Sequence, residues 1–300
     1  MNGVADARWI GPLFAIVGTL GFSFKAILIK LAYAWHPIDA TTLLALRMIY
    51  AAPFFIAMAW WAGRDAAPIP RPDALRLVAL GFIGYYLASL LDFIGLQYVS
   101  AGLGRLIMFL YPTLVVVLSM LFLKKTPTRR ELAALAITYA GIALVLSQQL
   151  AASAEQAAFL FGALLVFASS TCYAVYLVAG SQLVKRVGSL RFTAYTMIVS
   201  TLPAVVQFAL LESPAALELP PQLWWYVIIL AVGCTVVPVF LVAEALKRIG
   251  ANHFALIGAL GPVTTVLADF GLLGGALTSV QIAGGALVIL GVLLVSLKRS

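Results

Sequence analysis

Six ionisable side chains lie inside apolar runs that are long enough to cross a lipid bilayer. They are Lys25, Arg47, Asp92, Arg105, Glu244 and Asp269. An ionisable group in such a run is costly unless it faces a partner or a cavity. By their distance from the ends of the runs, five of them belong in one half of the membrane, whereas Glu244 lies near the opposite end beside Lys247 and Arg248. These residues predict an enclosed polar site whose chemistry is ion pairing and anion binding.

The five clustered residues have more than one interpretation. In the first, Asp92 and Asp269 pair with nearby cations, either as a gate that closes one side of the membrane or as structural ion pairs. The cations are Lys25, Arg47 and Arg105. In the second, a surplus cation binds the carboxylate of a substrate. In the third, Lys25 and Arg105 extend to the nearby headgroups.

Polar and aromatic side chains recur at helical spacing near the middle of several runs. We expect a mid-depth substrate pocket formed by Phe22, Tyr85, Ser89, Pro112, Tyr173, Tyr176, Pro262 and Thr265. Such a pocket is apolar with a few hydroxyl groups, and it suits a small amphiphile such as an apolar or aromatic amino acid. The alternative is that the aromatic residues serve packing or lie at the membrane interface.

Pro112 and Pro262 are expected near the centre of the bilayer. A proline inside a helix removes one main-chain hydrogen bond and frees a carbonyl, which a neighbouring group or a polar cavity can satisfy. The two prolines therefore indicate a central cavity or, alternatively, ordinary kinks that serve helix packing.

Ten apolar runs must position these residues. The chain has 300 residues, of which 63% are hydrophobic and 10% charged, and its mean hydropathy is +1.07. These values predict an all-α integral membrane protein. The expected spans cover residues 9–33, 38–62, 74–99, 102–123, 130–148, 158–183, 191–211, 222–247, 250–273 and 278–297. The first run has full length and no cleavage pattern after it, so we expect no cleavable signal peptide.

The second half of the sequence repeats the first at an offset of 150 residues. This offset aligns Pro112 with Pro262, Gly141 with Gly291, Pro53 with Pro203, and Leu96 with Leu246. Each half, 1–150 and 151–300, contains five spans, and an odd number inverts the second half in the membrane. Two inverted halves suit a transporter, because they can exchange conformations around a shared central site.

The basic residues indicate the orientation. With the N-terminus in the cytoplasm, the inner side collects Arg8, Arg64, Arg71, Arg76, Lys124, Lys125, Arg129, Arg130, Lys185, Arg186, Arg191, Lys247, Arg248, Lys298 and Arg299. This bias predicts a multi-pass protein of the cell inner membrane with both termini in the cytoplasm. It also accounts for the net charge of +8 without a nucleic-acid partner.

Several other functions lack their sequence signals. The chain has no phosphate-binding G-x-x-x-x-G-K-[ST] loop, no H-E-x-x-H and no G-x-S-x-G motif, so we expect neither a cofactor nor an intramembrane enzyme. His36 and His253 lie at opposite sides of the membrane, and no metal site is expected. A channel is less favoured, because it does not require two inverted halves. Gly284, Gly285 and Gly291 fit either a homodimer face or packing within the chain.

Two long segments and one arginine resemble a known family. The segments are LDFIGLQYVSAGLGRLIMFLYPTLVVVLSMLFL, from Leu91 to Leu123, and ALKRIGANHFALIGALGPVTTVLADFGLL, from Ala245 to Leu273. Together with Arg47 in LALRMIYAAPF, they resemble the EamA-type drug/metabolite transporter superfamily. One departure is that the GER or GEP sequence usual in that family after the fourth and ninth spans is replaced by LKKTPT and GGALT.

The resemblance implies a ten-span permease of two inverted halves with a central cavity and no ATP-binding domain. It implies facilitated or ion-coupled transport of a small-molecule substrate, most favourably export of amino acids, as in YddG-like members. A nucleotide sugar, a drug or another metabolite is the alternative substrate.

Overall fold

The structure is a computed structural model that describes residues 3–124, 126–258, 260–275 and 278–296. The side chains of Arg8, Lys125, Lys247, His253, Lys298 and Arg299 lie outside this description. Within it, the chain forms helices and no strand. In chain order these are α1 (Gly3–Trp35), α2 (Ala40–Gly63), α3 (Arg71–Gly81), η1 (Phe82–Leu87), α4 (Ala88–Tyr98), α5 (Ala101–Met108), α6 (Tyr111–Leu123), α7 (Arg129–Ala152), α8 (Gln156–Val187), α9 (Ser189–Leu211), η2 (Pro214–Leu217), α10 (Pro221–Ile228), η3 (Ile229–Val236), α11 (Val237–Gly258), α12 (Leu260–Leu273) and α13 (Ser279–Ser296).

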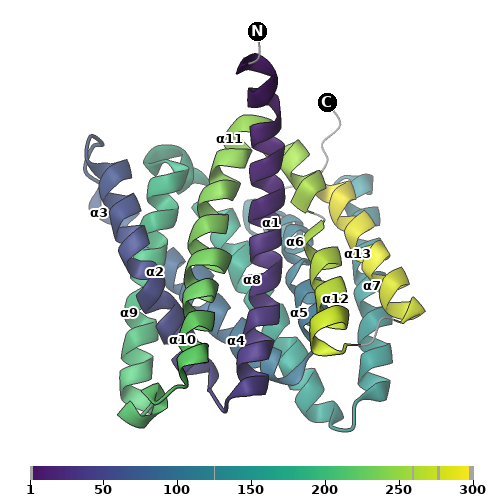
Figure 1. Ribbon diagram of the computed structural model, residues 1–300. Helices are drawn as coiled ribbons and strands as arrows, with labels where there is room; N and C mark the ends of the chain where they lie inside the picture. The colour runs from purple at the N-terminus through teal and green to yellow at the C-terminus, as the bar shows by residue number, and fades with distance from the viewer. Residues whose placement is uncertain (1–2, 125, 259, 276–277, 297–300) are drawn as a thin grey trace.

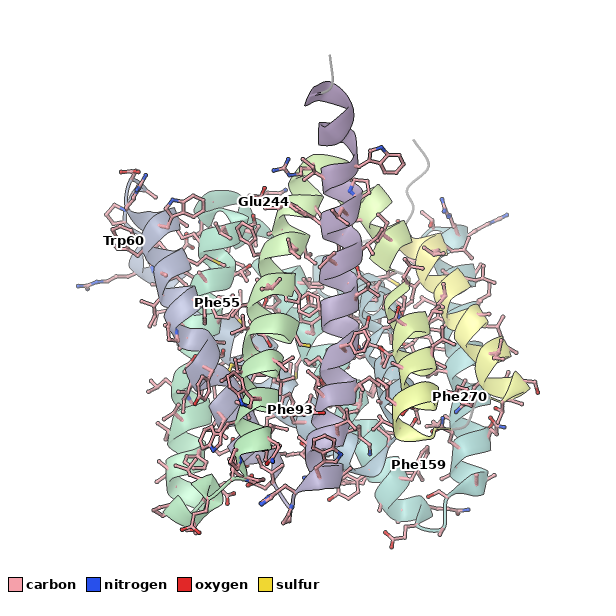
Figure 2. All side chains as sticks on the ribbon, viewed as in Figure 1. Phe55, Trp60, Phe93, Phe159, Glu244 and Phe270 are labelled. Carbon is pink, nitrogen blue, oxygen red and sulfur yellow. The ribbon has the colours of Figure 1, made fainter. Side chains whose placement is uncertain are left out.

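Eight of the helical segments in the described chain are long and apolar enough to cross a membrane. They overlap the first eight expected runs, with ends that differ by a few residues, and the last two runs correspond to the shorter apolar helices α12 and α13. Large apolar side chains project outward from these segments; Trp60, labelled in Figure 2, is 69% exposed. An apolar outer surface is what contact with lipid requires.

Figure 1 shows the helices packed in one bundle, with α1 beginning and α13 ending at the same end. We call this end the termini end and the opposite one the far end. Polar caps start several helices, as the sequence favours. Asp39 accepts a hydrogen bond of 2.8 Å from the Thr42 amide at the start of α2, and Thr128 with Glu131 forms a capping box on α7.

The helices are interrupted at corresponding places in the two halves. The π-helical segments η1 and η3 interrupt the third and eighth expected spans. In the fourth span, α5 ends at Met108 and α6 begins at Tyr111, just before Pro112. Since Pro112 cannot donate to the Met108 carbonyl, the Ser170 hydroxyl takes that role at 3.0 Å.

Four helices of the first half each pack antiparallel against a helix of the second half. Along α1, residues Gly11, Gly18 and Gly21 lie against successively earlier residues of α11, from Ile249 back to Pro238. The pairs α2 with α9, α4 with α8, and α7 with α13 also join the halves. Small residues at these contacts let the helix backbones approach closely.

The chain reverses direction between Ile249 and Gly261. Gly261 lies against Thr19, and the Thr265 hydroxyl donates to the Ser23 carbonyl at 3.1 Å, so α12 runs in the same direction as α1. The segment of α11 before Ile249 runs the opposite way. The expected break between runs 222–247 and 250–273 thus falls inside α11, whose helical geometry continues to Gly258.

The glycines of α13 pack within the chain. Gly284 lies against Val145 and Gly141 of α7, and Gly291 lies against Thr138. For Gly284 and Gly291 the structure therefore shows packing within the chain, which was one of the two expected interpretations.

We predict that Gly141→Ala destabilises the protein. An added Cβ would lie 2.6 Å from the Gly284 carbonyl oxygen and 2.9 Å from the Val288 nitrogen, both backbone atoms of α13. Overpacking of this kind costs about 1–3 kcal/mol. The measurement is the thermal midpoint of the protein in detergent. After heating, the protein that remains in the monodisperse peak on gel filtration is quantified at each temperature.

Gly271→Ala is the matched control, because nothing lies within 4 Å of its Cβ position and alanine favours a helix. Equal midpoints for the two variants would contradict the close packing of α7 on α13.

Candidate functional site

A cavity of about 240 Å³ lies inside the bundle, between the two halves of the chain. Its walls come from α1, α2, η1, α4, α5, α6, α8, α9, η3, α11 and α12. The lining residues are Thr19, Phe22, Ser23, Lys25, Arg47, Gly84, Tyr85, Ala88, Ser89, Asp92, Arg105, Met108, Phe109, Tyr111, Ser169, Tyr173, Met197, Cys234, Thr235, Val239, Val242, Phe254, Gly258, Gly261 and Pro262.

Most lining residues occur in pairs that are 150 positions apart. These pairs are Thr19 and Ser169, Ser23 and Tyr173, Arg47 and Met197, Gly84 and Cys234, Tyr85 and Thr235, Ser89 and Val239, Asp92 and Val242, Met108 and Gly258, and Tyr111 and Gly261. The same positions of both halves therefore face one space, although the paired side chains differ in chemistry.

An ion pair joins α1 to α4 at the cavity wall. The Lys25 ammonium lies 2.7 Å from an Asp92 carboxylate oxygen, and the two side chains are 13% and 4% exposed. This pair is one of those expected from the sequence. It directs Lys25 inward, whereas the headgroup interpretation requires it to extend outward.

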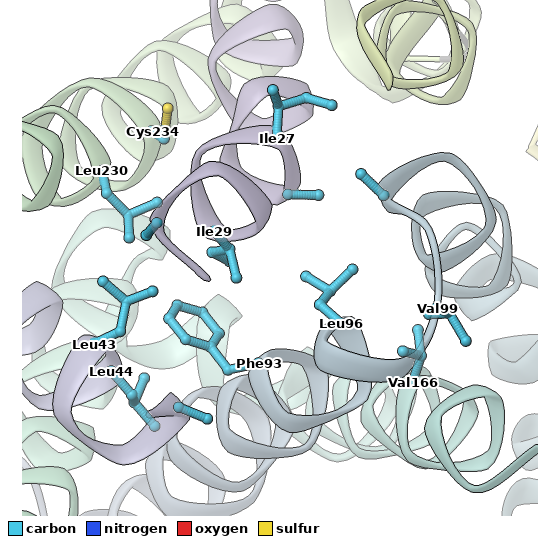
Figure 3. Packing of buried hydrophobic residues seen from close by; sticks show 14 of the residues in the cluster. Ile27, Ile29, Leu43, Leu44, Phe93, Leu96, Val99, Val166, Leu230 and Cys234 are labelled. Carbon is cyan, nitrogen blue, oxygen red and sulfur yellow. The ribbon is translucent and has the colours of Figure 1, made fainter. Parts of the chain in front are cut away.

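Arg47 is buried beside this pair with few partners. Its guanidinium donates to the Ser89 hydroxyl at 2.9 Å and lies 5.0 Å from the centre of the Phe93 ring. Figure 3 shows Phe93 packed toward Leu43 and Ile29, so the ring is held by α1 and α2. The Nε atom of Arg47 is buried without a hydrogen-bond partner.

Arg105 approaches the cavity from α5. One of its terminal nitrogens donates to the Phe22 carbonyl at 3.1 Å, and its Nε atom, like that of Arg47, is buried without a partner. Arg105 therefore also points into the protein rather than to the headgroups.

Cations outnumber anions along the described lining. Lys25, Arg47 and Arg105 face it, whereas Asp92 is its one carboxylate. Because charge is costly to bury without compensation, this wall attracts an anion.

Aromatic side chains form another wall of the cavity. The rings of Tyr111 and Tyr173 lie 5.2 Å apart, and Phe109 lies 6.3 Å from Tyr111. Behind them, Tyr176 packs 5.1 Å from Tyr85 and 5.2 Å from Phe192. These edge-to-face and stacked contacts hold the wall in a fixed arrangement that suits a flat apolar group.

The structure places five of the eight expected pocket residues on the lining and three outside it. Phe22, Tyr85, Ser89, Tyr173 and Pro262 line the cavity. Tyr176 lies in the second layer of rings, and Thr265 is turned toward the Ser23 carbonyl. Pro112 acts through the backbone, since it breaks the helix beside the lining residue Tyr111.

Two of the six expected charges lie away from the cavity lining. Asp269 accepts a hydrogen bond of 2.9 Å from the Gly102 amide, so it stabilises the first turn of α5 instead of pairing with Lys25 or an arginine. Glu244 pairs with Arg248 at 3.6 Å, and Figure 2 shows it toward the termini end.

Sequence reasoning missed several lining residues, although one signal was available for them. Three of them lie 150 positions after a polar or charged lining residue: Met197 after Arg47, Ser169 after Thr19, and Val239 after Ser89. Searching for counterparts of the polar and charged residues would have found them. Phe254 has no such partner on the lining.

Contacts between α1 and α4 lie beyond the charged wall, toward the far end. The Lys30 ammonium donates to the Leu96 carbonyl and the Tyr33 hydroxyl to the Phe93 carbonyl, each at 2.9 Å. Toward the termini end, the lining extends to Val242 and Phe254.

Comparison with known proteins gives matches over almost the whole chain. Residues 9–147 and 160–297 each match the EamA-like transporter family. The chain is 31% identical over 285 residues, 91% of its own length and 88% of the relative's, to the protein named Uncharacterized transporter YcbK of Bacillus subtilis (strain 168). Over 170 residues, 52% of this chain and 50% of the relative, it is 28% identical to the S-adenosylmethionine/S-adenosylhomocysteine transporter of Chlamydia trachomatis serovar L2. A solved crystal structure covering 97% of both chains has a TM-score of 0.66 at 19% identity, so it shares the fold.

We predict that Asp92→Asn destabilises the protein strongly, because it leaves the buried Lys25 ammonium without its counter-charge. Breaking one side of a buried pair costs about 3–5 kcal/mol. The double variant Lys25→Met with Asp92→Leu should recover part of this loss, as measured by the thermal midpoint in detergent.

Asp65→Asn is the matched control, since the Arg64–Asp65 pair is exposed and such pairs contribute about 0–1 kcal/mol. If Asp92→Asn were as mild as Asp65→Asn, the ion pair would not be a structural element of the cavity.

Proposed function

The chain belongs to the EamA-like transporter family and is a multi-pass membrane transport protein, and we propose that it is a secondary transporter which exports small amino-acid-like metabolites with an apolar or aromatic body. Transport proceeds by alternating access around the central cavity. The alternative substrates are a nucleotide sugar, a drug or another metabolite.

The observation that carries this proposal is the cavity lined by equivalent positions of the two halves. A site shared in this way can be exposed first to one side and then to the other when the halves exchange conformations. Neither an intramembrane enzyme nor a single-chain channel requires such an arrangement.

The proposed topology has ten crossings, five in residues 1–150 and five in residues 151–300. The reversal between Ile249 and Gly261 supports separate eighth and ninth crossings. Antiparallel packing of α1 on α11, α2 on α9, α4 on α8 and α7 on α13 supports inverted halves. The two matches to the family, one in each half, agree with this division.

The size and chemistry of the cavity favour a small amphiphile. Its volume of about 240 Å³ is below the roughly 300–1,000 Å³ typical of sites for drug-sized ligands. A charged wall and an aromatic wall suit a molecule with one polar and one apolar part. The substrate named for the Chlamydia trachomatis relative also carries an amino-acid portion, which supports this class.

We propose that both termini are cytoplasmic in the cell inner membrane, since the basic residues gather at the termini end. The far end then faces outward, and we propose that the contacts of Lys30 and Tyr33 with α4 help to close the carrier on its outer side.

Reconstituted protein tests the function directly. We expect liposomes that contain the protein and an unlabelled apolar or aromatic amino acid to accumulate the labelled compound by saturable counterflow, because a carrier with one central site exchanges bound molecules. Arg130→Gln, an exposed change outside the cavity lining, should behave like the natural sequence. If no amino acid shows counterflow while nucleotide sugars or drugs do, the alternative substrate class is correct.

Fusion reporters test the topology. Green fluorescent protein fused after Ser300 should fluoresce, and alkaline phosphatase should be inactive there. Alkaline phosphatase fused after Glu155, between α7 and α8, should be active, because an odd number of crossings precedes it. The reverse pattern would overturn the proposed orientation.

A further inference from the structure

We propose that Arg47 and Arg105 together bind a carboxylate of the transported molecule, and that the substrates are therefore small carboxylic acids with an apolar or aromatic body. This inference rests on the proposed transport function and names the chemical group that its site recognises.

The first support is the incomplete hydrogen bonding of the two guanidinium groups. Arg47 is 3% exposed, and its oxygen partner among the described residues is the neutral hydroxyl of Ser89. Arg105 donates to the neutral carbonyl of Phe22. Both Nε atoms are buried without a partner. Buried donors of charged groups are normally satisfied, so these two arginines retain capacity for an acceptor that enters the cavity.

The second support is that the nearest carboxylate is already engaged. Asp92 holds Lys25 at 2.7 Å, and within the described chain no carboxylate oxygen lies within 4.0 Å of either guanidinium. Asp269 is engaged by the Gly102 amide. An incoming anion would therefore meet two cations without displacing an existing ion pair.

The third support is the match between the groups. The planar guanidinium presents its donors as a fork that fits a carboxylate, and its charge is permanent. The two arginines approach one cavity from α2 and α5. A carboxylate bound there leaves the rest of the molecule facing the aromatic wall of Phe109, Tyr111 and Tyr173.

The same arrangement predicts which groups are dispensable. An ammonium group would find no unpaired carboxylate among the described lining residues, because Asp92 is held by Lys25. The carboxylate should therefore be required, whereas the α-amino group should not.

Four related probes separate these requirements with the unaltered protein. L-phenylalanine, its amide, 3-phenylpropionate and 2-phenylethylamine are compared as ligands of the purified protein in detergent, by thermal shift and by calorimetry. We expect the two acids to bind, and the amide and the amine to bind at least roughly tenfold more weakly. Equal binding of acid and amide, or binding of neither acid, overturns the carboxylate site. So does competition by inorganic phosphate as strong as that by the acids.

Variants then assign the binding to the two arginines. Arg47→Gln and Arg105→Gln should each weaken acid binding about 10- to 150-fold, the range for a hydrogen bond to a charged group, and abolish the preference for acid over amide. Arg47→Lys and Arg105→Lys should keep part of that preference, because they retain the charge without the fork. Arg130→Gln should leave both affinities unchanged. Unaltered acid binding in the correctly folded glutamine variants overturns the assignment.

The counterflow assay distinguishes failure of this inference from failure of the proposed function. A protein that exchanges phenylalanine and its amide equally well is still a carrier, but its site does not select the carboxylate. A protein that exchanges no compound of any class refutes the transport function itself.

Discussion

Burial of one carboxylate among three cations inside an apolar bundle is the constraint on which the rest of the structure depends. Asp92 can lie there only because α1 brings Lys25 to within 2.7 Å, and α2 and α5 bring Arg47 and Arg105 to the same wall. Four helices of the first half must therefore meet at one depth. The ring of Phe93 lies beneath Lys25 and Arg47, at 5.9 and 5.0 Å, and fills the space that water would otherwise take.

Much of this arrangement could be predicted from the sequence, because depth in a membrane follows from position along a run. Lys25, Arg47, Asp92 and Arg105 were expected in one half of the bundle, and the structure gathers them on one wall. Their partners could not be predicted in the same way. Which side chains meet depends on the rotation and tilt of each helix, which its neighbours set. Asp269 was expected in the same half, yet its side chain meets the first turn of α5 rather than the cations.

The departures from regular helix were also beyond the sequence pattern. Apolar runs predict that helices exist, but they do not predict the π-helical segments η1 and η3. The composition of these segments resembles that of the α-helices on either side. The segment η1 lies at a close contact between helices. At Gly84, for example, an added Cβ would overlap the Tyr176 side chain. Prolines predicted the irregular backbone better. Pro112 predicted a carbonyl without its helical partner, and the structure shows that this is the Met108 carbonyl, which accepts a hydrogen bond from the Ser170 hydroxyl.

The two halves of the sequence carry different side chains at the positions that form the ion pair. The counterparts of Lys25, Arg47 and Asp92 at an offset of 150 residues are Val175, Met197 and Val242. If the halves exchange conformations, the counterparts of the Lys25–Asp92 ion pair at the termini end are the two valines Val175 and Val242. One closure then depends on charge and the other on apolar contact. An anion held by Arg105 and Arg47 would act on the charged closure alone, because only there does its charge alter the balance among buried groups. In the proposed transport cycle, the two halves would move in the same way, while the bound substrate would act on one closure and not on the other.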